Sequence, residues 1–250
     1  MIRVPLAVVV ACMALLASPT VAVAQTYNHL DANGDNAAYS ELPDGTVTSV
    51  ATIDPNVDIG TIDHAYGKRT LTMTASVSSF YSDATHLPGV SFYVVSKGGW
   101  VQEFWYEERT DPVTNELSGW MGYQRLQGKG KVSKKCKRMT ARFDDATSSV
   151  VITVPSSCVR SSKRIRIATE GWQFDTTSAV NSWFGNSDDG QSADLMAVDG
   201  TMWTSPPIKR GGSGVVTDAM RSPVSSYALA SLIDRARLSP AKISGGRQVR

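Results

Sequence analysis

Alternation of apolar and polar residues with a period of two recurs along the chain, and it restricts the fold more than any other feature. In the clearest run, Leu71, Met73, Ala75 and Val77 alternate with threonine and serine. Successive side chains of a strand point to opposite faces of its sheet, so this run predicts a strand with one buried and one hydrated face. Long helical periodicity is nearly absent before residue 220. The pattern therefore predicts an all-β protein.

The same period identifies further strands, each bounded by turn residues. The candidate strands are 57–63, 70–78, 90–95, 100–106, 120–126, 137–143, 150–154 and 164–169. Gly98-Gly99 and Asp111-Pro112 mark turns between neighbouring candidates, as antiparallel hairpins require. About seven to nine short strands of this kind predict an antiparallel β-sandwich.

Two cysteines, Cys136 and Cys158, flank one predicted hairpin and are expected to form a disulfide across its base. Pairing the apolar faces of the hairpin sets Phe143 opposite Val150, and the cysteines differ from this register by one residue. A bulge near Pro155 would absorb the difference, because proline cannot donate a hydrogen bond to a sheet. A disulfide indicates an oxidising compartment, and two free thiols are the alternative.

The N-terminus predicts export. A single positive charge precedes an apolar run from Val4 to Ala17, and Ala22-Val23-Ala24 forms a small-x-small cleavage signature. These features predict a signal peptide over residues 1–24 and a secreted, extracellular protein with no membrane span after cleavage. The alternative is that Val9-Val10-Ala11-Cys12 is a lipobox, which would anchor the protein through a lipid on Cys12.

The predicted β-sandwich domain covers residues 25–204, and the sequence changes character after it. Residues 205–250 are expected to hold a flexible linker, rich in glycine at 209–214, and a short C-terminal amphipathic helix. Ser222-Pro223 would supply the N-cap and the first-turn proline of this helix. The helix would either dock on the domain or bind a partner or surface.

Three short stretches carry a family resemblance: Asp31-x-x-Gly34-Asp35, Val57-Asp58-Ile59 and the hairpin from Cys136 to Cys158. They resemble a group of secreted actinobacterial β-sandwich proteins, most of them uncharacterised. The layout of that group is similar to the sandwiches of carbohydrate-binding modules and of DOMON-type domains. The resemblance covers about residues 28–175 and implies a fold rather than an activity.

Aromatic residues concentrate between residues 100 and 123. Trp100, Trp105, Trp120 and Tyr123 are candidates for a stacking platform, because flat aromatic rings pack well on the apolar faces of sugar rings. Packing in the core is the alternative for each of them, since at least one face of every strand in this region must build the core.

Basic residues concentrate between residues 125 and 166, a segment that contains 12 basic and 2 acidic residues. Arg138, Arg142, Arg164 and Arg166 would point outward, and they would form a cationic face if their strands were neighbours. Such a face would bind a cell-wall or glycan polyanion; no nucleic-acid-binding motif accompanies it. A hydrated surface balanced by acidic neighbours is the alternative.

One loop has the spacing of a calcium site. Asp31, Asn33 and Asp35 place three oxygen-bearing side chains at alternate positions, which suits Ca²⁺. The match to a complete calcium loop fails at Asn36 and Leu42, so an ordinary turn is the alternative. No cofactor other than calcium is expected.

Catalysis has little support, because the chain holds no nucleophile elbow, phosphate loop or histidine pair with metal-binding spacing. Glu103, Glu107, Glu108 and Glu116 could supply the carboxylate pair of a glycoside hydrolase, if two lie about 5 Å or roughly 6.5–9.5 Å apart. The sequence therefore favours a secreted, non-catalytic binding module for extracellular glycan or cell-wall polyanion. The alternatives are a glycoside-directed hydrolase and a structural or accessory envelope protein.

Overall fold

The computed structural model describes thirteen stretches of the chain. They are residues 24–31, 37–41, 47–51, 56–83, 86–96, 100–111, 113–126, 136–159, 163–175, 184–189, 202–218, 222–224 and 247–248. Within these ranges the chain forms strands and turns and contains no α-helix, so the predicted all-β sandwich is confirmed. None of the described residues belongs to a helix that could span a membrane. Residues 1–23 of the predicted signal peptide, including Cys12, lie outside the described residues. Its last predicted residue, Ala24, belongs to the first strand.

One of the two main sheets, sheet A, has six strands. In spatial order they are β15 (Val215–Val216), β1 (Ala24–Leu30), β4 (Ile59–Gly67), β5 (Thr70–Val77), β10 (Ser149–Pro155) and β9 (Thr140–Asp144). All neighbours are antiparallel except β15 and β1. Burial alternates strictly along β5, as its sequence predicts, so this sheet has one buried face.

The second main sheet, sheet B, is larger and wholly antiparallel. In spatial order its strands are β17 (Arg247–Gln248), β8 (Leu117–Leu126), β7 (Trp100–Thr110), β6 (His86–Ser96), β11 (Arg164–Asp175), β12 (Phe184–Asp189), β2 (Ala37–Glu41) and β3 (Val47–Ala51). The short strand β14 (Ile208–Lys209) also pairs with β11. A separate two-stranded sheet joins β13 (Met202–Thr204) to β16 (Ser222–Val224).

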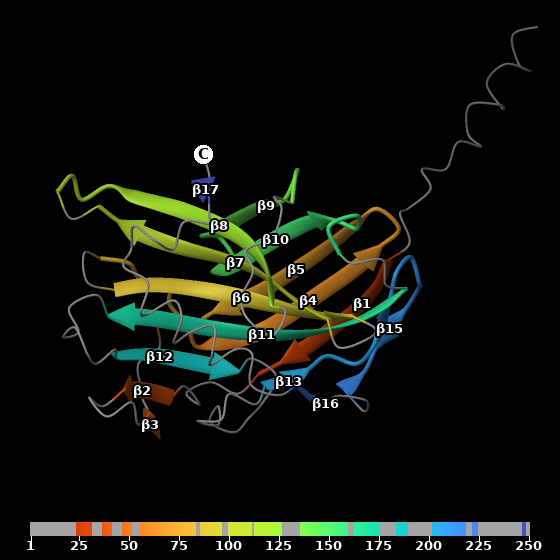
Figure 1. The fold of residues 1–250 in the computed structure, drawn as a ribbon, viewed down its shortest axis with the longest axis horizontal. Helices are drawn as coiled ribbons and strands as arrows, with labels where there is room; N and C mark the ends of the chain where they lie inside the picture. Colours follow the sequence, from red (N-terminus) through yellow and green to blue (C-terminus); the bar gives the residue numbers. More distant parts are fainter. Residues whose placement is uncertain are drawn as a thin grey trace, which may run out of the picture.

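The two sheets enclose one hydrophobic core, and the strands of sheet A run obliquely behind those of sheet B (Figure 1). Sheet A contributes Leu71 and Ile152 to this core, and sheet B contributes Phe92, Phe104 and Ile167, all fully buried. Burial of each such side chain stabilises the fold by roughly 1.5–3 kcal/mol. The inter-sheet contact is therefore the main source of stability.

A histidine lies inside this core. His64 on β4 packs against Tyr27 and forms an edge-to-face contact with Phe92, with ring centroids 5.9 and 5.7 Å away. Its Nε2 lies 3.4 Å from the hydroxyl of Thr169 on sheet B. Burial disfavours the charged imidazolium and lowers the pKa of His64 to about 3. The residue is thus a neutral core side chain at physiological pH.

The disulfide and the hairpin register follow the sequence. Cys136 and Cys158 are bonded, with their Cα atoms 5.6 Å apart, and Val150 pairs with Phe143 as predicted. The predicted bulge near Pro155 is not seen in β10, because its register with β5 is continuous up to Pro155. The one-residue offset lies beyond the ladder with β9, where residues 137–138 and 156–158 form turns. A disulfide of this kind is compatible with an extracellular protein.

Residues 205–218 are not the separate linker that their composition suggested. β14 pairs with β11 of sheet B, and β15 pairs with β1 of sheet A. Glycine here provides turn conformations between the two strands, with positive φ at Gly211 and Gly214. The predicted helix cap at Ser222-Pro223 is also wrong, since both residues belong to β16; residues 225–246 lie outside the described ranges.

Replacing Cys136 and Cys158 by serine should lower the free energy of unfolding by about 3 kcal/mol, because the bond restricts the unfolded chain over a sequence separation of 22 residues. Urea denaturation monitored by tryptophan fluorescence measures the change. The Ser157→Ala variant alters an exposed side chain in the same turn and serves as a control with unchanged stability. An unaltered midpoint for the double variant would show that the bond is not a constraint.

The stability of the protein should fall in acid partly through His64. The unfolded chain binds a proton near pH 6.5 whereas the folded chain does so only near pH 3, so stability is lost as the pH falls between these values. From pH 7 to pH 5 the wild type should lose about 2 kcal/mol more than the His64→Gln variant. Denaturation curves at the two pH values measure both losses, and equal losses would contradict the assignment.

Candidate functional site

The central strands of sheet B, β6, β7 and β11, are buried on both faces, unlike the strands of sheet A. Along β6 and β7 the burial is continuous rather than alternating. One face packs into the inter-sheet core through Phe92, Phe104 and their neighbours. The opposite face, called here the outer face of sheet B, holds side chains that are equally shielded from water. In a strand buried on both sides every polar group needs a hydrogen-bond partner, so the polar residues of this face are expected to be bonded to one another.

The register places the outer-face residues in rows across β7, β6 and β11. One row sets Glu107 beside Gly89, and Gly89 beside Trp172. The next row sets Trp105 beside Ser91, and Ser91 beside Glu170. A third row begins with Glu103 beside Tyr93. Three glutamates therefore share one face with two tryptophans and a tyrosine.

Two glycines seat the tryptophans of this face. A Cβ atom on Gly122 would lie 1.8 Å from Cζ2 of Trp105, and one on Gly89 would lie 2.2 Å from Cζ2 of Trp172. Both distances are far below van der Waals contact, so each indole lies directly against the backbone of the neighbouring strand. Any other residue at either glycine would push the indole off the sheet.

Glu103 is held by donors from two neighbouring strands. The hydroxyl of Ser91 on β6 donates to Oε1 of Glu103 at 2.9 Å, and the amide of Gln124 on β8 donates to Oε2. Ser91 in turn accepts a hydrogen bond of 2.9 Å from the indole nitrogen of Trp172. Glu103 has an exposed fraction of 0%. Donors of this kind stabilise the ionised carboxylate in a site with little water.

Glu170 reaches toward the same part of the face from β11. The hydroxyl of Tyr93 donates to its Oε2 at 2.5 Å, and Glu170 is also 0% exposed. Glu103 and Glu170 lie on strands separated by β6, so their backbones are roughly 10 Å apart across the sheet. Each carboxylate accepts a hydrogen bond from a side chain of β6, and Glu103 accepts a second one from β8.

Glu107 completes the acidic set. Its carboxylate pairs with Arg109 two residues along β7 and is 2% exposed. Burial raises the pKa of Glu107, and the charge and hydrogen bonds of Arg109 oppose this shift. The guanidinium of Arg109 also lies 4.9 Å from the ring centroid of Trp120. This contact joins the half-buried Trp120 to the outer-face set.

The other two predicted carboxylates lie elsewhere. Glu108 faces the inter-sheet side, where it accepts a hydrogen bond of 3.0 Å from the hydroxyl of Tyr106 and where burial raises its pKa. Glu116 is exposed in the turn between β7 and β8. The carboxylates that meet on the outer face are therefore Glu103, Glu107 and Glu170. Glu170 was missed because the predicted strand ended at residue 169; the alternation continues through Glu170 and Trp172.

The four predicted aromatic residues divide between the two faces. Trp105 and Trp120 belong to the outer face, with Trp120 beside Glu107 in the register. Tyr123 lies in the core, stacked on Phe104 with centroids 4.9 Å apart. Trp100 is half-buried at the start of β7. The aromatic pattern thus located the correct strands but could not separate core from outer face.

The predicted arginines do not come together on neighbouring strands. Arg138 and Arg142 lie at or before β9, at an edge of sheet A. Arg164 and Arg166 lie on β11 in the middle of sheet B. Arg142 is exposed and pairs with Asp144. Because β9 and β11 are in different sheets, the condition for a shared cationic face is not met; residues 127–135, which hold the densest lysines, lie outside the described ranges.

The calcium loop is only partly described. Asp31 is buried at the end of β1, with its Oδ1 3.9 Å from Nε2 of His29. The pKa of His29 is raised, chiefly by Asp31 and also by Asp218. Asn33 and Asp35 lie outside the described residues, and the described part of the chain holds no group of three acidic, histidine or cysteine residues suited to a metal. Calcium binding stays a prediction.

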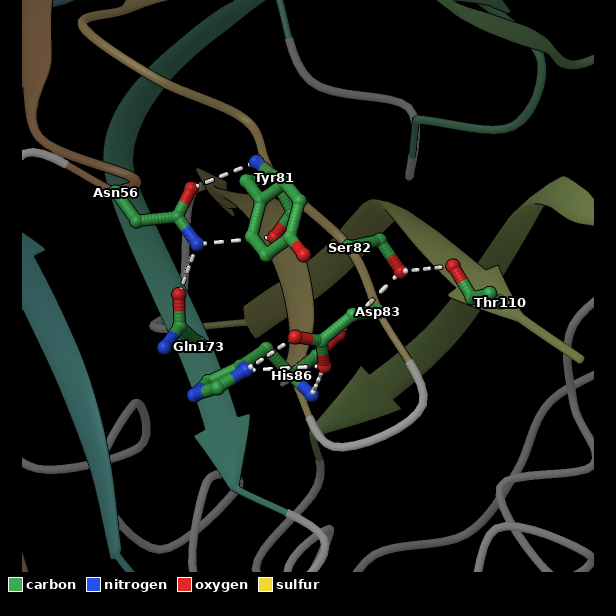
Figure 2. A network of polar contacts seen from close by, with 7 residues as sticks. All are labelled: Asn56, Tyr81, Ser82, Asp83, His86, Thr110 and Gln173. Carbon is green, nitrogen blue, oxygen red and sulfur yellow. Dashed lines mark hydrogen bonds and ion pairs between the residues drawn. The ribbon is translucent and has the colours of Figure 1, made fainter. Parts of the chain in front are cut away.

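A separate polar network closes one end of the sandwich (Figure 2). The amide of Asn56 donates to the carbonyl of Tyr81 and accepts from its backbone N–H, and it also donates to Gln173 on β11. Asp83 accepts from the backbone N–H of His86 at the start of β6. These bonds hold a loop against the ends of strands, so the role of the network is to stabilise the fold.

Comparison with known proteins adds nothing to this geometry: no family model, curated protein or solved structure matches the chain significantly. The function therefore has to be argued from the outer face alone. That face combines flat aromatic rings, buried hydrogen-bond acceptors and three carboxyl groups. Such a set can stack on a sugar ring, accept hydrogen bonds from its hydroxyls, and hold or transfer protons.

Ser91→Ala should lower the free energy of unfolding by about 1–3 kcal/mol, because it removes one hydrogen bond from buried Glu103 and one from buried Trp172. Thermal and urea denaturation measure the loss. Ser118→Ala is the matched control: it also removes a hydrogen bond to an indole, that of Trp120, but at a half-buried position. Equal losses for the two variants would show that burial of the network has no energetic weight.

Proposed function

We propose that the protein is an extracellular glycan-binding protein whose ligand contacts the outer face of sheet B. The observation that carries the proposal is the joint burial of Trp105, Trp172, Glu103 and Glu170 in adjacent rows of one sheet face. Indole rings stack on the apolar faces of sugars, and buried carboxylates accept hydrogen bonds from sugar hydroxyls. The predicted signal peptide supports an extracellular ligand.

The charge of this face favours a neutral or amino-bearing sugar over a polyanion. Glu103, Glu107 and Glu170 bring three carboxyl groups to this face, and Arg109 pairs with Glu107. An anionic polymer would meet like charges in a site with little water, where repulsion is strongest. The polyanion prediction therefore has no support from the outer face.

Binding is expected to change tryptophan fluorescence. Trp120 is a half-buried indole of the outer face, and a ligand stacked on it would change the surroundings of its ring. A thermal-shift and fluorescence titration of the mature protein should use soluble neutral glucans, xylans, chitosan oligomers and, for contrast, acidic polysaccharides. A neutral or amino-bearing glycan should raise the melting temperature, because it binds the native state alone.

The Trp120→Ala and Glu170→Gln variants should weaken that binding roughly tenfold or more, in line with the loss of one stacking or charged contact. Thr72→Ala, on the hydrated face of sheet A, is the control and should bind like the wild type. If only acidic polysaccharides bind, or if the outer-face variants bind as well as Thr72→Ala, the proposed site is wrong.

Glycoside hydrolysis is a second candidate, favoured by two buried carboxylates, those of Glu103 and Glu170, that are both hydrogen-bonded to side chains of β6. In such a reaction one carboxylic acid protonates the departing glycosidic oxygen, and the other carboxylate either attacks the sugar carbon or activates a water that does. Glu103 suits the ionised role because Ser91 and Gln124 donate to it.

Release of reducing ends from the glycan that binds measures this second activity. If hydrolysis occurs, Glu103→Gln and Glu170→Gln should each lower the rate about 100-fold or more, because each removes a group that transfers protons or attacks. Binding without any release of reducing ends would identify a binding protein and exclude the hydrolase.

A further inference from the structure

Four lysine–arginine pairs gather at one end of the sandwich, called here the basic end. Each pair lies in a turn or at the end of a strand, and all eight side chains are exposed. The basic end lies where β10 ends and β11 begins, on the right of Figure 1. The pairs are Lys68-Arg69 between β4 and β5, Lys137-Arg138 before β9, Lys163-Arg164 where β11 starts, and Lys209-Arg210 where β14 ends.

Hydrogen bonds connect three of these pairs across the two sheets. Arg164 pairs with Lys209 in the register of β11 and β14, and the backbone N–H of Arg210 donates to the carbonyl of Lys163 at 2.9 Å. The guanidinium of Arg210 donates to the carbonyl of Lys68 at 2.9 Å. This last bond runs from a strand paired with sheet B to a turn of sheet A, so the three pairs lie side by side.

The fourth pair, before β9, is held at the same end through the disulfide. Ser156 follows β10, and its backbone N–H donates to the carbonyl of Arg69 at 2.8 Å while its hydroxyl donates to the carbonyl of Lys68 at 3.0 Å. Two residues later, Cys158 is bonded to Cys136, which directly precedes the fourth pair. The basic side chains therefore project from backbone segments that hydrogen bonds and one covalent bond hold together.

The described segments of the basic end carry positive charge alone. They are residues 65–71, 136–141, 153–159, 163–165 and 206–213, and none of these residues is acidic. Acidic residues lie at the opposite end, among them Asp111 and Glu116 between β7 and β8 and Asp144 and Asp145 between β9 and β10. Like charges so close together repel one another, and a ligand with several negative charges relieves that repulsion.

We propose that the basic end binds a linear acidic polysaccharide, whose carboxylates or sulphates repeat along the chain. Lysine and arginine both attract such groups, and a guanidinium can bind an oxyanion through two parallel hydrogen bonds. The fourth pair lies two strands beyond β5, roughly 10 Å across sheet A. A single small anion does not reach across this distance, whereas a polymer contacts several pairs at once.

Other polyanionic partners suit this end less well. A bilayer surface is usually held by apolar side chains as well as by charge, and the exposed large apolar residues among the described ones, such as Val113 and Leu117, lie outside these segments. Single-stranded nucleic acid stacks its bases on aromatic rings. The one aromatic residue in the described segments of the basic end, Tyr66, is fully buried.

The basic end is also separate from the outer face of sheet B. The outer face covers the broad side of the central strands, whereas the basic end is built from turns and strand ends. The carboxyl groups of the outer face disfavour an acidic ligand, and the cations of the basic end attract one. The two sites would therefore take glycans of different charge.

The test measures the anisotropy of fluorescein-labelled oligogalacturonate as the mature protein is added. Binding should be saturable and should weaken as salt is added, because salt screens charges at the surface. The same oligomer with its carboxylates methyl-esterified is the matched ligand control and should show no salt-sensitive binding. Tighter binding to vesicles of phosphatidylglycerol or to single-stranded DNA than to oligogalacturonate would overturn the choice of ligand.

Two single variants test the site itself. Arg69→Gln and Lys209→Gln each remove one exposed charge, the first from a turn of sheet A and the second from β14, and each should weaken binding roughly fivefold. Arg142→Gln is the matched control, because it removes one exposed charge on β9, where Arg142 pairs with Asp144 outside the basic end. This control should bind as tightly as the wild type.

Equal losses in all three variants would show that net charge alone governs binding, and unchanged binding of Arg69→Gln and Lys209→Gln would reject the site. The altered side chains are exposed, so the three variants should fold like the wild type, and equal melting temperatures check this. The neutral-glycan titration uses other ligands and other variants, so either proposal can fail while the other stands.

Discussion

The burial of the central strands of sheet B on both faces is the constraint on which the rest of this structure depends. One face gains its stability from the apolar contact with sheet A, where Phe92, Phe104 and Ile167 meet Leu71 and Ile152. The other face carries glutamates, a serine and a tyrosine that are equally shielded from water. Burying such groups costs free energy unless each is hydrogen-bonded, and a buried charge costs the most. The strands of sheet B have to hold a particular register so that these partners meet.

That register explains why the network has its composition. Ser91 lies on the central strand, where it can donate to Glu103 from β7 and accept from Trp172 on β11. Gly89 and Gly122 lie where the indoles need direct access to the backbone. A polar face built in this way costs stability compared with an apolar one, and this cost is the physical basis of the proposed role in binding. The hydrated, threonine-rich face of sheet A carries no comparable set of buried carboxylates among its described residues.

Much of the fold could be predicted from the sequence because strand formation leaves a local mark. The alternation in 70–78, the turn between Phe143 and Val150, and the cysteine pair all depend on residues close together along the chain, and the structure bears them out. Predictions failed where composition was a poor guide to pairing. The glycine-rich segment near 210 has the composition of a linker, yet its flanking residues pair with β11 and β1. The partner strand β1 lies more than a hundred residues away along the chain, so local composition could not indicate this pairing.

The candidate site shows the same division. The sequence determined that the chain forms period-two strands closed by a disulfide, and that aromatic and acidic residues are concentrated along β7. It could not determine which of the two alternating sets faces sheet A, because both sets contain large apolar residues. Tertiary structure alone decided that Tyr123 packs in the core while Trp105 does not. It also decided that β11, which carries Glu170, is separated from β7, which carries Glu103, by β6 alone. The physical reason is that the order of strands in a sheet follows from the packing of the whole chain, whereas the period of a strand follows from its own backbone geometry.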